Sequence, residues 1–116
     1  MGHTNVKIKI YGPKGSEEVE LLVDTGSTYS WVSRPLLEKL GIEPKGKKLF
    51  KTIDDRHIER EIGEAVIEVM GEKATTIVVF ADEGAQVLGV HGLEGLGLEV
   101  DPITEKLKKA EALLAI

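Results

Sequence analysis

Hydrophobic and polar residues alternate along much of this chain, as they do in β-strands with one buried face. Near the start, apolar Val6, Ile8 and Ile10 alternate with lysines, and the pattern returns after a turn rich in glycine and proline at residues 12–16. We therefore predict that residues 5–23 form a β-hairpin, whose second strand ends in a short, fully apolar stretch.

The rest of the chain repeats this organisation of short strands separated by turns. Two short helices are predicted: one after Ser33, with Pro35 in its first turn and Gly41 at its end, and one over His91–Leu96 that Gly97 ends. The predicted strands are Tyr29–Val32, Lys47–Ile53, Ile58–Val69, Thr75–Phe80 and Leu98–Val100, with Val87-Leu88-Gly89-Val90 preceding the second helix. Many short strands with one or two short helices predict an all-β fold, a small closed β-barrel.

The C-terminal segment fits two patterns. The apolar positions within residues 107–114 follow helical spacing after a cap at Thr104, whereas Leu113–Ile116 fits a strand equally well. The sequence favours neither of these alternatives.

Length and composition limit the architecture and the partners. A chain of 116 residues suits a single domain, here residues 1–116. Its 20 acidic residues against 15 Lys plus Arg, with 4% aromatics, argue against a nucleic-acid partner. No membrane span or signal peptide is recognised, so we expect no membrane partner and a cytoplasmic protein. Because cysteine is absent and the three histidines lack metal-ligand spacing, we expect neither thiol catalysis nor a metal.

The candidate chemistry lies where the second strand ends, in Asp24-Thr25-Gly26-Ser27. A carboxylate placed directly after a buried apolar strand is held rigidly and is expected to be partly removed from water. Gly26 lets the backbone come close, so that its N–H or a neighbour's can donate to the carboxylate. These are the requirements of a preorganised acid–base group, although the same tripeptide also forms ordinary turns. A phosphate-binding loop of the actin type needs two large lobes, which this length excludes.

Together these features resemble the retropepsin-like, or retroviral-type, aspartic protease family, in particular its small archaeal and bacterial versions. The resemblance covers nearly the whole chain. It includes the first hairpin, the motif at Asp24, a long hairpin at residues 47–69 where the family has its flap, and Val87-Leu88-Gly89 before a short helix. Because family members use two such motifs and this chain has one, the resemblance implies one half of a two-fold active site.

The resemblance implies a homodimeric aspartic endopeptidase that acts on a peptide or protein substrate without a cofactor. Asp24 of each subunit would share a proton and activate a water, supported by Thr25, Gly26 and Ser27, with Thr25 bonding across the dimer base. The apolar segment Ala112–Ile116 would add to the interface. Two alternatives remain: a catalytically silent retropepsin-like dimerisation or peptide-binding module, and a monomeric β-protein with a structural turn.

The resemblance also implies residues around the substrate. The flap candidates are Ile53, Asp54, Asp55, Arg56, His57 and Ile58. The candidates for the substrate pocket are Tyr29, Trp31, Leu88 and Val90, although the two aromatic residues fit core packing as well.

Two features depart from the retroviral pattern. Thr28 and Val90 stand where an Asp and an Arg usually pair, so another contact must brace the dimer. The flap tip is polar rather than glycine-rich, which either slows its opening or lets Arg56 and His57 select acidic substrates. The simpler interpretation of His57 is a solvated turn residue, and that of His91 is a position on the helix surface.

Overall fold

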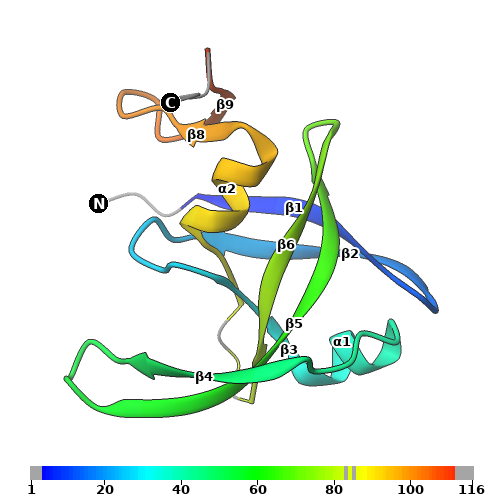
Figure 1. Ribbon diagram of the computed structural model, residues 1–116. Coiled ribbons are helices and arrows are strands. Elements are labelled where there is room, and N and C mark those ends of the chain that lie inside the picture. The colour runs from blue at the N-terminus through cyan, green and yellow to red at the C-terminus, as the bar shows by residue number, and fades with distance from the viewer. Residues whose placement is uncertain (1–3, 83, 85, 112–116) are drawn as a thin grey trace, which may run out of the picture.

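The computed structural model describes residues 4–82, 84 and 86–111, and strands make up most of them (Figure 1). None of the helices in these ranges is long and apolar enough to cross a membrane. The helices are α1 (Arg34–Lys39) and α2 (Val90–Leu96). The strands are β1 (Asn5–Gly12), β2 (Gly15–Val23), β3 (Ser30–Ser33), β4 (Gly46–Lys51), β5 (His57–Val69), β6 (Glu72–Ala81), β7 (Val87–Leu88), β8 (Leu98–Val100) and β9 (Leu107–Lys109).

Six of the strands pair side by side and form a closed ring, because the last strand also pairs with the first. Their order is β1-β2-β7-β3-β6-β5, and β5 pairs back to β1. Two of these pairings, β2 with β7 and β3 with β6, are parallel, and the others are antiparallel. The predicted all-β fold is confirmed, and its closed arrangement takes the form of this ring.

The hydrophobic core follows from the alternation along the strands. In β1, Ile8 and Ile10 are buried while the lysines between and beside them stay accessible, as the sequence pattern predicts. Leu93 and Leu96 of α2 add a helical face to the same core. Burial of one such aliphatic side chain stabilises the fold by about 1.5–3 kcal/mol, so these alternating positions hold the ring together.

The β4–β5 hairpin projects from the ring because only part of β5 belongs to the ring. Residues 62–69 of β5 pair with β6, whereas residues 57–62 pair with β4. β4 is an end strand of the sheet, so the hairpin extends freely beyond the ring (Figure 1). The long hairpin predicted for residues 47–69 is therefore present.

In the C-terminal segment, the structure rules out one of the two alternatives that the sequence left open. Residues 107–109 form β9, which pairs with β8 through Leu98↔Lys109 and Val100↔Leu107, so the helical alternative is wrong here. The Asp101 carboxylate accepts the backbone N–H groups of Ile103 and Thr104 and so stabilises the turn that returns the chain along β8. The alternative strand at Leu113–Ile116 and the expected interface segment Ala112–Ile116 lie outside the described residues.

The start of α1 also differs from its prediction in one respect. Ser33 occupies the N-cap position and Pro35 lies in the first turn, as expected, but the Ser33 side chain makes no capping hydrogen bond. Ser33 is still part of β3, where it pairs with Ala81 of β6, so the strand rather than a side-chain cap sets the beginning of the helix.

Candidate active site

The loop that carries Asp24 is held by hydrogen bonds on both sides of the carboxylate. The Asp24 N–H donates to the carbonyl of Leu88 at 3.0 Å, and the Ser27 N–H donates to the Asp24 carbonyl at 3.1 Å, which closes a tight turn. The Gly26 N–H donates to Asp24 Oδ1 at 2.9 Å. This last bond is the donation predicted from the sequence, and it fixes one carboxylate oxygen relative to the backbone.

The Asp24 carboxylate is nevertheless open to water in the single chain. Asp24, Thr25 and Gly26 are all exposed, while Ser27 and Tyr29 are half-buried. The expectation that Asp24 is partly removed from water by its own chain is therefore wrong. The strand end holds the backbone in place, but the side chain points beyond the core, so desolvation would require a further molecule against this loop.

A second segment, the junction of β7 and α2, braces the Asp24 loop from beneath. The N–H groups of Val90 and His91 donate to the carbonyls of Ser27 and Thr28 at 2.9 and 3.0 Å. The N–H of Gly89 donates to the hydroxyl of Ser30 at 3.0 Å in a buried position. The two motifs that the sequence singled out, separated by more than sixty residues, thus meet in one unit.

Ser30 was not identified from the sequence. Its side chain is 1% exposed, and its hydroxyl accepts the Gly89 N–H, which would otherwise be buried without a partner. The available signal was a hydroxyl residue at an inward position of a short strand, because polar residues are seldom buried without a specific partner.

We predict that Ser30→Ala destabilises the fold by about 1–3 kcal/mol, because it leaves the buried Gly89 N–H without its acceptor. The free energy of unfolding in urea measures this loss. Thr76→Val is the matched control, since the buried Thr76 hydroxyl has no described hydrogen-bond partner and its removal is expected to cost little. Equal stabilities of Ser30→Ala and the wild type would contradict the bracing role of Ser30.

Of the predicted pocket residues, Tyr29 and Trp31 make aromatic contacts with the hairpin, whereas Leu88 supports the Asp24 loop. Tyr29 and Trp31 are half-buried, and both contact Phe50 of β4, with ring centroids 6.2 and 5.1 Å apart in edge-on geometry. His91 is exposed and lies edge-on to Tyr29 at 5.8 Å. These aromatic contacts join the segment after Asp24 to the hairpin. Phe50 was not singled out from the sequence, where nothing but its place in a predicted strand pointed to it.

Leu88 does not line a pocket in the chain. Its side chain is completely buried in the core, and its carbonyl receives the Asp24 N–H, so it supports the loop instead. Val90, the fourth pocket candidate, is half-buried at the start of α2, where its N–H is bound by the Ser27 carbonyl.

All six flap candidates lie at the free end of the hairpin. The turn is closed by the Thr52 N–H, which donates to the Arg56 carbonyl at 2.8 Å, and by the Thr52 hydroxyl, which donates to the Asp54 carboxylate. Arg56 Nε binds Asp54 Oδ2 at 2.8 Å, and Lys51 Nζ binds Asp55 Oδ1 at 2.9 Å. Ile53 is fully exposed, His57 is exposed and Ile58 is half-buried.

The tip is therefore stabilised by its own charges. The hydrogen bond from Thr52, followed by that from Arg56, holds the pKa of Asp54 below its ordinary value. Asp54 thus stays ionised as the pH falls through that ordinary value, and its bonds across the turn persist into acid solution.

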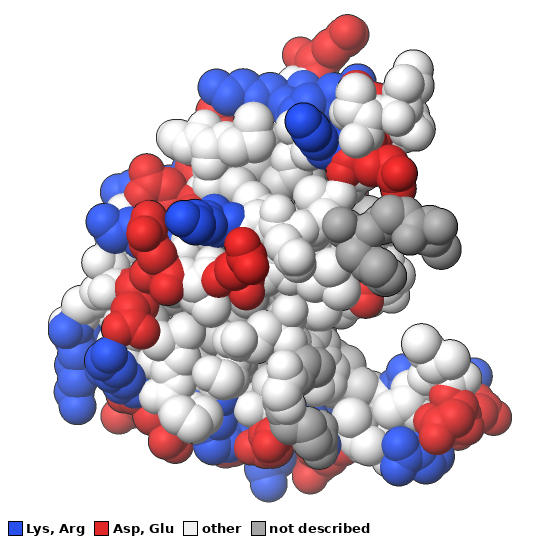
Figure 2. All heavy atoms as spheres, turned by 180° about the vertical axis from the view of Figure 1, so that it is seen from behind, with Lys and Arg blue, Asp and Glu red and all other residues white. Residues whose placement is uncertain are grey.

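The loop and the hairpin face a common hollow. The β2–β3 loop, which carries Asp24, projects on the same side of the molecule as the β4–β5 hairpin (Figure 1). Seen from behind, the space-filling view shows a deep hollow between the hairpin and the body of the ring (Figure 2). The hollow is bordered by the hairpin and the body of the ring, and it is open to solvent.

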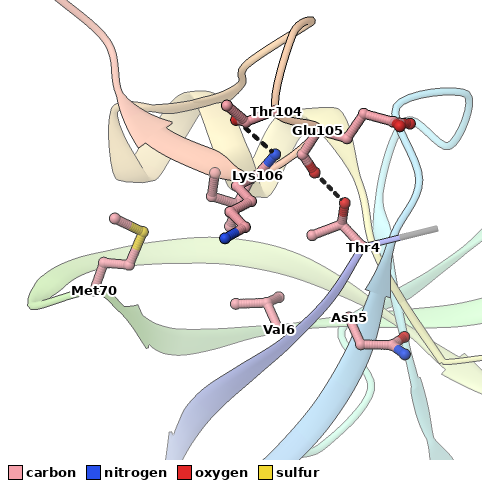
Figure 3. A pocket seen from close by; sticks show the side chains of 8 residues that line it. Thr4, Asn5, Val6, Met70, Thr104, Glu105 and Lys106 are labelled. Atoms are coloured by element: carbon pink, nitrogen blue, oxygen red, sulfur yellow. Dashed lines mark hydrogen bonds between the residues drawn. The ribbon is translucent and has the colours of Figure 1, made fainter. Parts of the chain in front are cut away.

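Two cavities elsewhere contain none of the predicted site residues. One, of about 530 Å³, lies between the start of β1, Met70 of the β5–β6 turn and residues 104–107, with the Lys106 side chain beside Val6 (Figure 3). The other, of about 350 Å³, lies between the β1–β2 turn and β5. Within the described ranges, no three His, Asp or Glu side chains are grouped to hold a metal ion.

Comparison with known proteins gives one match. A family model described as aspartyl protease matches residues 6–100, a range that includes the Asp24 loop, the hairpin and the β7–α2 junction. A search of curated proteins found no match. The family model spans most of the 116 residues. The chain therefore belongs to the aspartyl protease family, of the retropepsin-like type.

Proposed function

We propose that this chain is an aspartic endopeptidase that acts as a homodimer, each subunit supplying one domain and one half of the active site. The observation that carries the proposal is the position and environment of the Asp24 carboxylate. Its carboxylate is exposed, one oxygen is fixed by the Gly26 N–H, and it lies at the end of an apolar strand in a chain of the aspartyl protease family.

The need for two subunits follows from the chemistry. Hydrolysis of a peptide bond by carboxylates requires one ionised group to accept a proton from water and one protonated group to donate. The sequence holds a single Asp-Thr-Gly tripeptide. A two-fold axis beside the exposed residues Asp24, Thr25 and Gly26 would bring two copies of the motif together and remove both carboxylates from water.

In such a dimer the two Asp24 carboxylates act as a pair. Because like charges at close range cannot both ionise without cost, the pair shares one proton. The ionised carboxylate accepts a proton from the attacking water. The protonated carboxylate donates to the peptide carbonyl and later passes a proton to the leaving amine. Thr25 of each subunit would bond across the base of the dimer.

The hollow beneath the hairpin supplies the place for the peptide. Tyr29, Trp31 and Val90 are half-buried and would contact substrate side chains there, together with Phe50, which contacts Trp31. The hairpin would close over the bound peptide and exclude water during the reaction.

The charges at the hairpin tip are proposed to influence the choice of substrate. We expect the double variant Arg56→Ala/His57→Ala to lose about fivefold in kcat/KM on peptides with acidic side chains, relative to their amide counterparts, since exposed charge pairs contribute modestly. Paired peptides that differ only as Glu or Gln measure this ratio. Because Arg56 is already bound to Asp54, a larger change is not expected. An unchanged ratio together with an unchanged rate would rule out both a selective and a rate-limiting role for the tip.

The proposal is tested by cleavage of a diverse peptide mixture between about pH 3 and pH 7, a range that brackets the apparent pKa values of a carboxylate pair. The wild-type chain is compared with Asp24→Asn, and the product ends are identified by mass spectrometry. Cleavage by the wild type alone supports the endopeptidase. A folded dimer without activity would favour the silent peptide-binding module, and a monomer would favour a structural turn.

A further inference from the structure

The hairpin leaves the ring at a defined point on β5. Ile62 pairs with Val79 of β6 and also with Gly46 of β4, so it belongs to both the ring and the hairpin. Arg60 and Glu61 are the first residues beyond it that pair with β4 alone. Contacts made by these two side chains with the ring therefore act at the root of the hairpin and influence the angle at which it projects.

Both side chains meet a partner that directly follows a strand of the ring: Arg34 begins α1 after β3, and Asp82 follows β6. Glu61 Oε1 binds Arg34 Nη1 at 2.8 Å, and Arg60 Nε lies 3.7 Å from Asp82 Oδ2. Arg34 Nε also binds Asp82 Oδ1 at 2.6 Å. Arg34 and Asp82 are neighbours because each follows one residue of the parallel pair Ser33↔Ala81, which ends β3 and β6. One network of alternating charges thus connects the hairpin to two strands of the ring.

The network differs from the ordinary surface ion pairs of this chain. The side chains of Arg34 and Arg60 are only 27% and 16% exposed, whereas Lys39, in a pair with Glu17, is 66% exposed. The Arg34 guanidinium also lies over the Phe80 ring at 5.1 Å, which restricts its position further. Ion pairs with ordered, partly buried arginines hold geometry better than exposed lysine pairs.

The pair of Arg34 with Asp82 is also suited to acid solution. The hydrogen bond from Arg34 is the main cause that holds the pKa of Asp82 below its ordinary value of 3.8. A lowered pKa in the folded state means that the Asp82 carboxylate stays charged as the pH falls through the ordinary value, and loses its charge only below that. The connection to Arg34 therefore persists over the acidic range in which a carboxylate pair would work.

We propose that Arg34 is a positioning residue that fixes the β4–β5 hairpin relative to the Asp24 loop, by joining Glu61 of the hairpin to Asp82, which directly follows β6. The position of the hairpin does not depend on activity, but the consequence for catalysis rests on the proposed function. Nearer the tip, Phe50 of the hairpin also contacts the body, against Tyr29 and Trp31. Loss of the ion pairs where the hairpin leaves the ring is expected to weaken the contact of Phe50, because the ion pairs and Phe50 belong to the same two-stranded hairpin.

Trp31 provides a direct measurement of the hairpin position, since it is the single tryptophan of the chain and contacts the hairpin through Phe50. We expect Glu61→Gln and Arg34→Gln each to raise the acrylamide quenching constant of Trp31 by about twofold. The reason is that loss of one partly buried ion pair enlarges the population of molecules in which the hairpin has moved away from Trp31. Lys39→Gln, which removes the pair with Glu17 on another part of the surface, is the control and is expected to quench as the wild type does.

The double variant tests whether Arg34 and Glu61 act on the hairpin together or independently of each other. If Arg34 acts on the hairpin through Glu61, Arg34→Gln/Glu61→Gln quenches no more than the stronger single variant. Glu61 is one-third exposed on the hairpin, so Glu61→Gln is expected to fold even if Arg34→Gln does not. Wild-type quenching in a Glu61→Gln variant with an unchanged circular dichroism spectrum would overturn the proposal.

Activity gives the second readout. On a cleaved peptide, Glu61→Gln is expected to raise KM by about threefold to fivefold with a smaller change in kcat, because the loss falls on substrate closure rather than on the carboxylates. Increased quenching in a chain that cleaves nothing would support the positioning role and reject the endopeptidase. Normal wild-type cleavage with an unchanged KM and unchanged quenching in Glu61→Gln would reject the positioning role alone.

Discussion

Asp24→Asn is expected to lower peptide cleavage by at least about a thousandfold, because positioned acid–base groups contribute about 10²–10⁴-fold and both active-site carboxylates of the dimer are lost at once. Asparagine has the same shape as aspartate and keeps an oxygen that can accept the Gly26 N–H, so the loop geometry is retained. Only the capacity to ionise and to carry the shared proton is removed. Initial rates on one cleaved peptide, measured across the pH range, give the size of the loss.

Asp101→Asn is the matched control for this substitution. Asp101 accepts the N–H groups of Ile103 and Thr104 at the β8–β9 turn, and asparagine preserves an acceptor there. Its cleavage rate is expected to equal that of the wild type. Wild-type activity should rise as one carboxylate of the pair ionises and fall when both are ionised. Activity retained by Asp24→Asn would show that the reaction does not use this carboxylate.

A mixing experiment tests whether the two carboxylates come from different subunits. Equal amounts of wild-type and Asp24→Asn chains, allowed to exchange, are expected to show about half the activity of the wild-type chains alone, because random pairing leaves half of them with an inactive mate. Undiminished activity after demonstrated exchange would indicate that each chain works without the Asp24 of another.

The features that the sequence predicted well are local ones. The first hairpin and the projecting hairpin follow from alternation and from turn residues that lie close together in the chain. The hydrogen bond from Gly26 to Asp24 is also local, since donor and acceptor are two residues apart. Such features need no knowledge of which strands become neighbours.

The features that the sequence missed depend on distant pairings. Ser30 acquires its contact only because β3 lies beside β7, and Phe50 acquires its contact because β4 lies close to Trp31 of β3. Leu88 fits a pocket residue by position, but ring closure buries it. In the tail, helical spacing after Thr104 is overruled by the turn that Asp101 stabilises. In each case tertiary structure decided between patterns that were locally equivalent.

Gly89→Ala is the substitution expected to damage the site most without touching a catalytic group. A Cβ at this position would lie 2.4 Å from the Tyr29 carbonyl oxygen and 2.7 Å from that of Ser27. Both atoms belong to the backbone that follows Asp24, so relief requires the loop itself to move. The φ of Gly89 is −92°, which any residue adopts, so the requirement for glycine is one of space. We expect a loss of about 3 kcal/mol in the free energy of unfolding, the upper part of the range for overpacking.

The same displacement is expected to reduce activity in those molecules that remain folded. A shift of the Asp24 loop by about 1 Å misplaces the carboxylate and can cost about a hundredfold in rate. Urea denaturation and initial rates at a temperature where the variant is folded measure the two effects separately. Gly46→Ala is the control, because a Cβ there meets nothing within 4 Å. If Gly89→Ala matched Gly46→Ala in both stability and rate, the contact between the β7–α2 junction and the Asp24 loop would not position the carboxylate. The hydrogen bond between Ser30 and Gly89 would then have no role in positioning the carboxylate either.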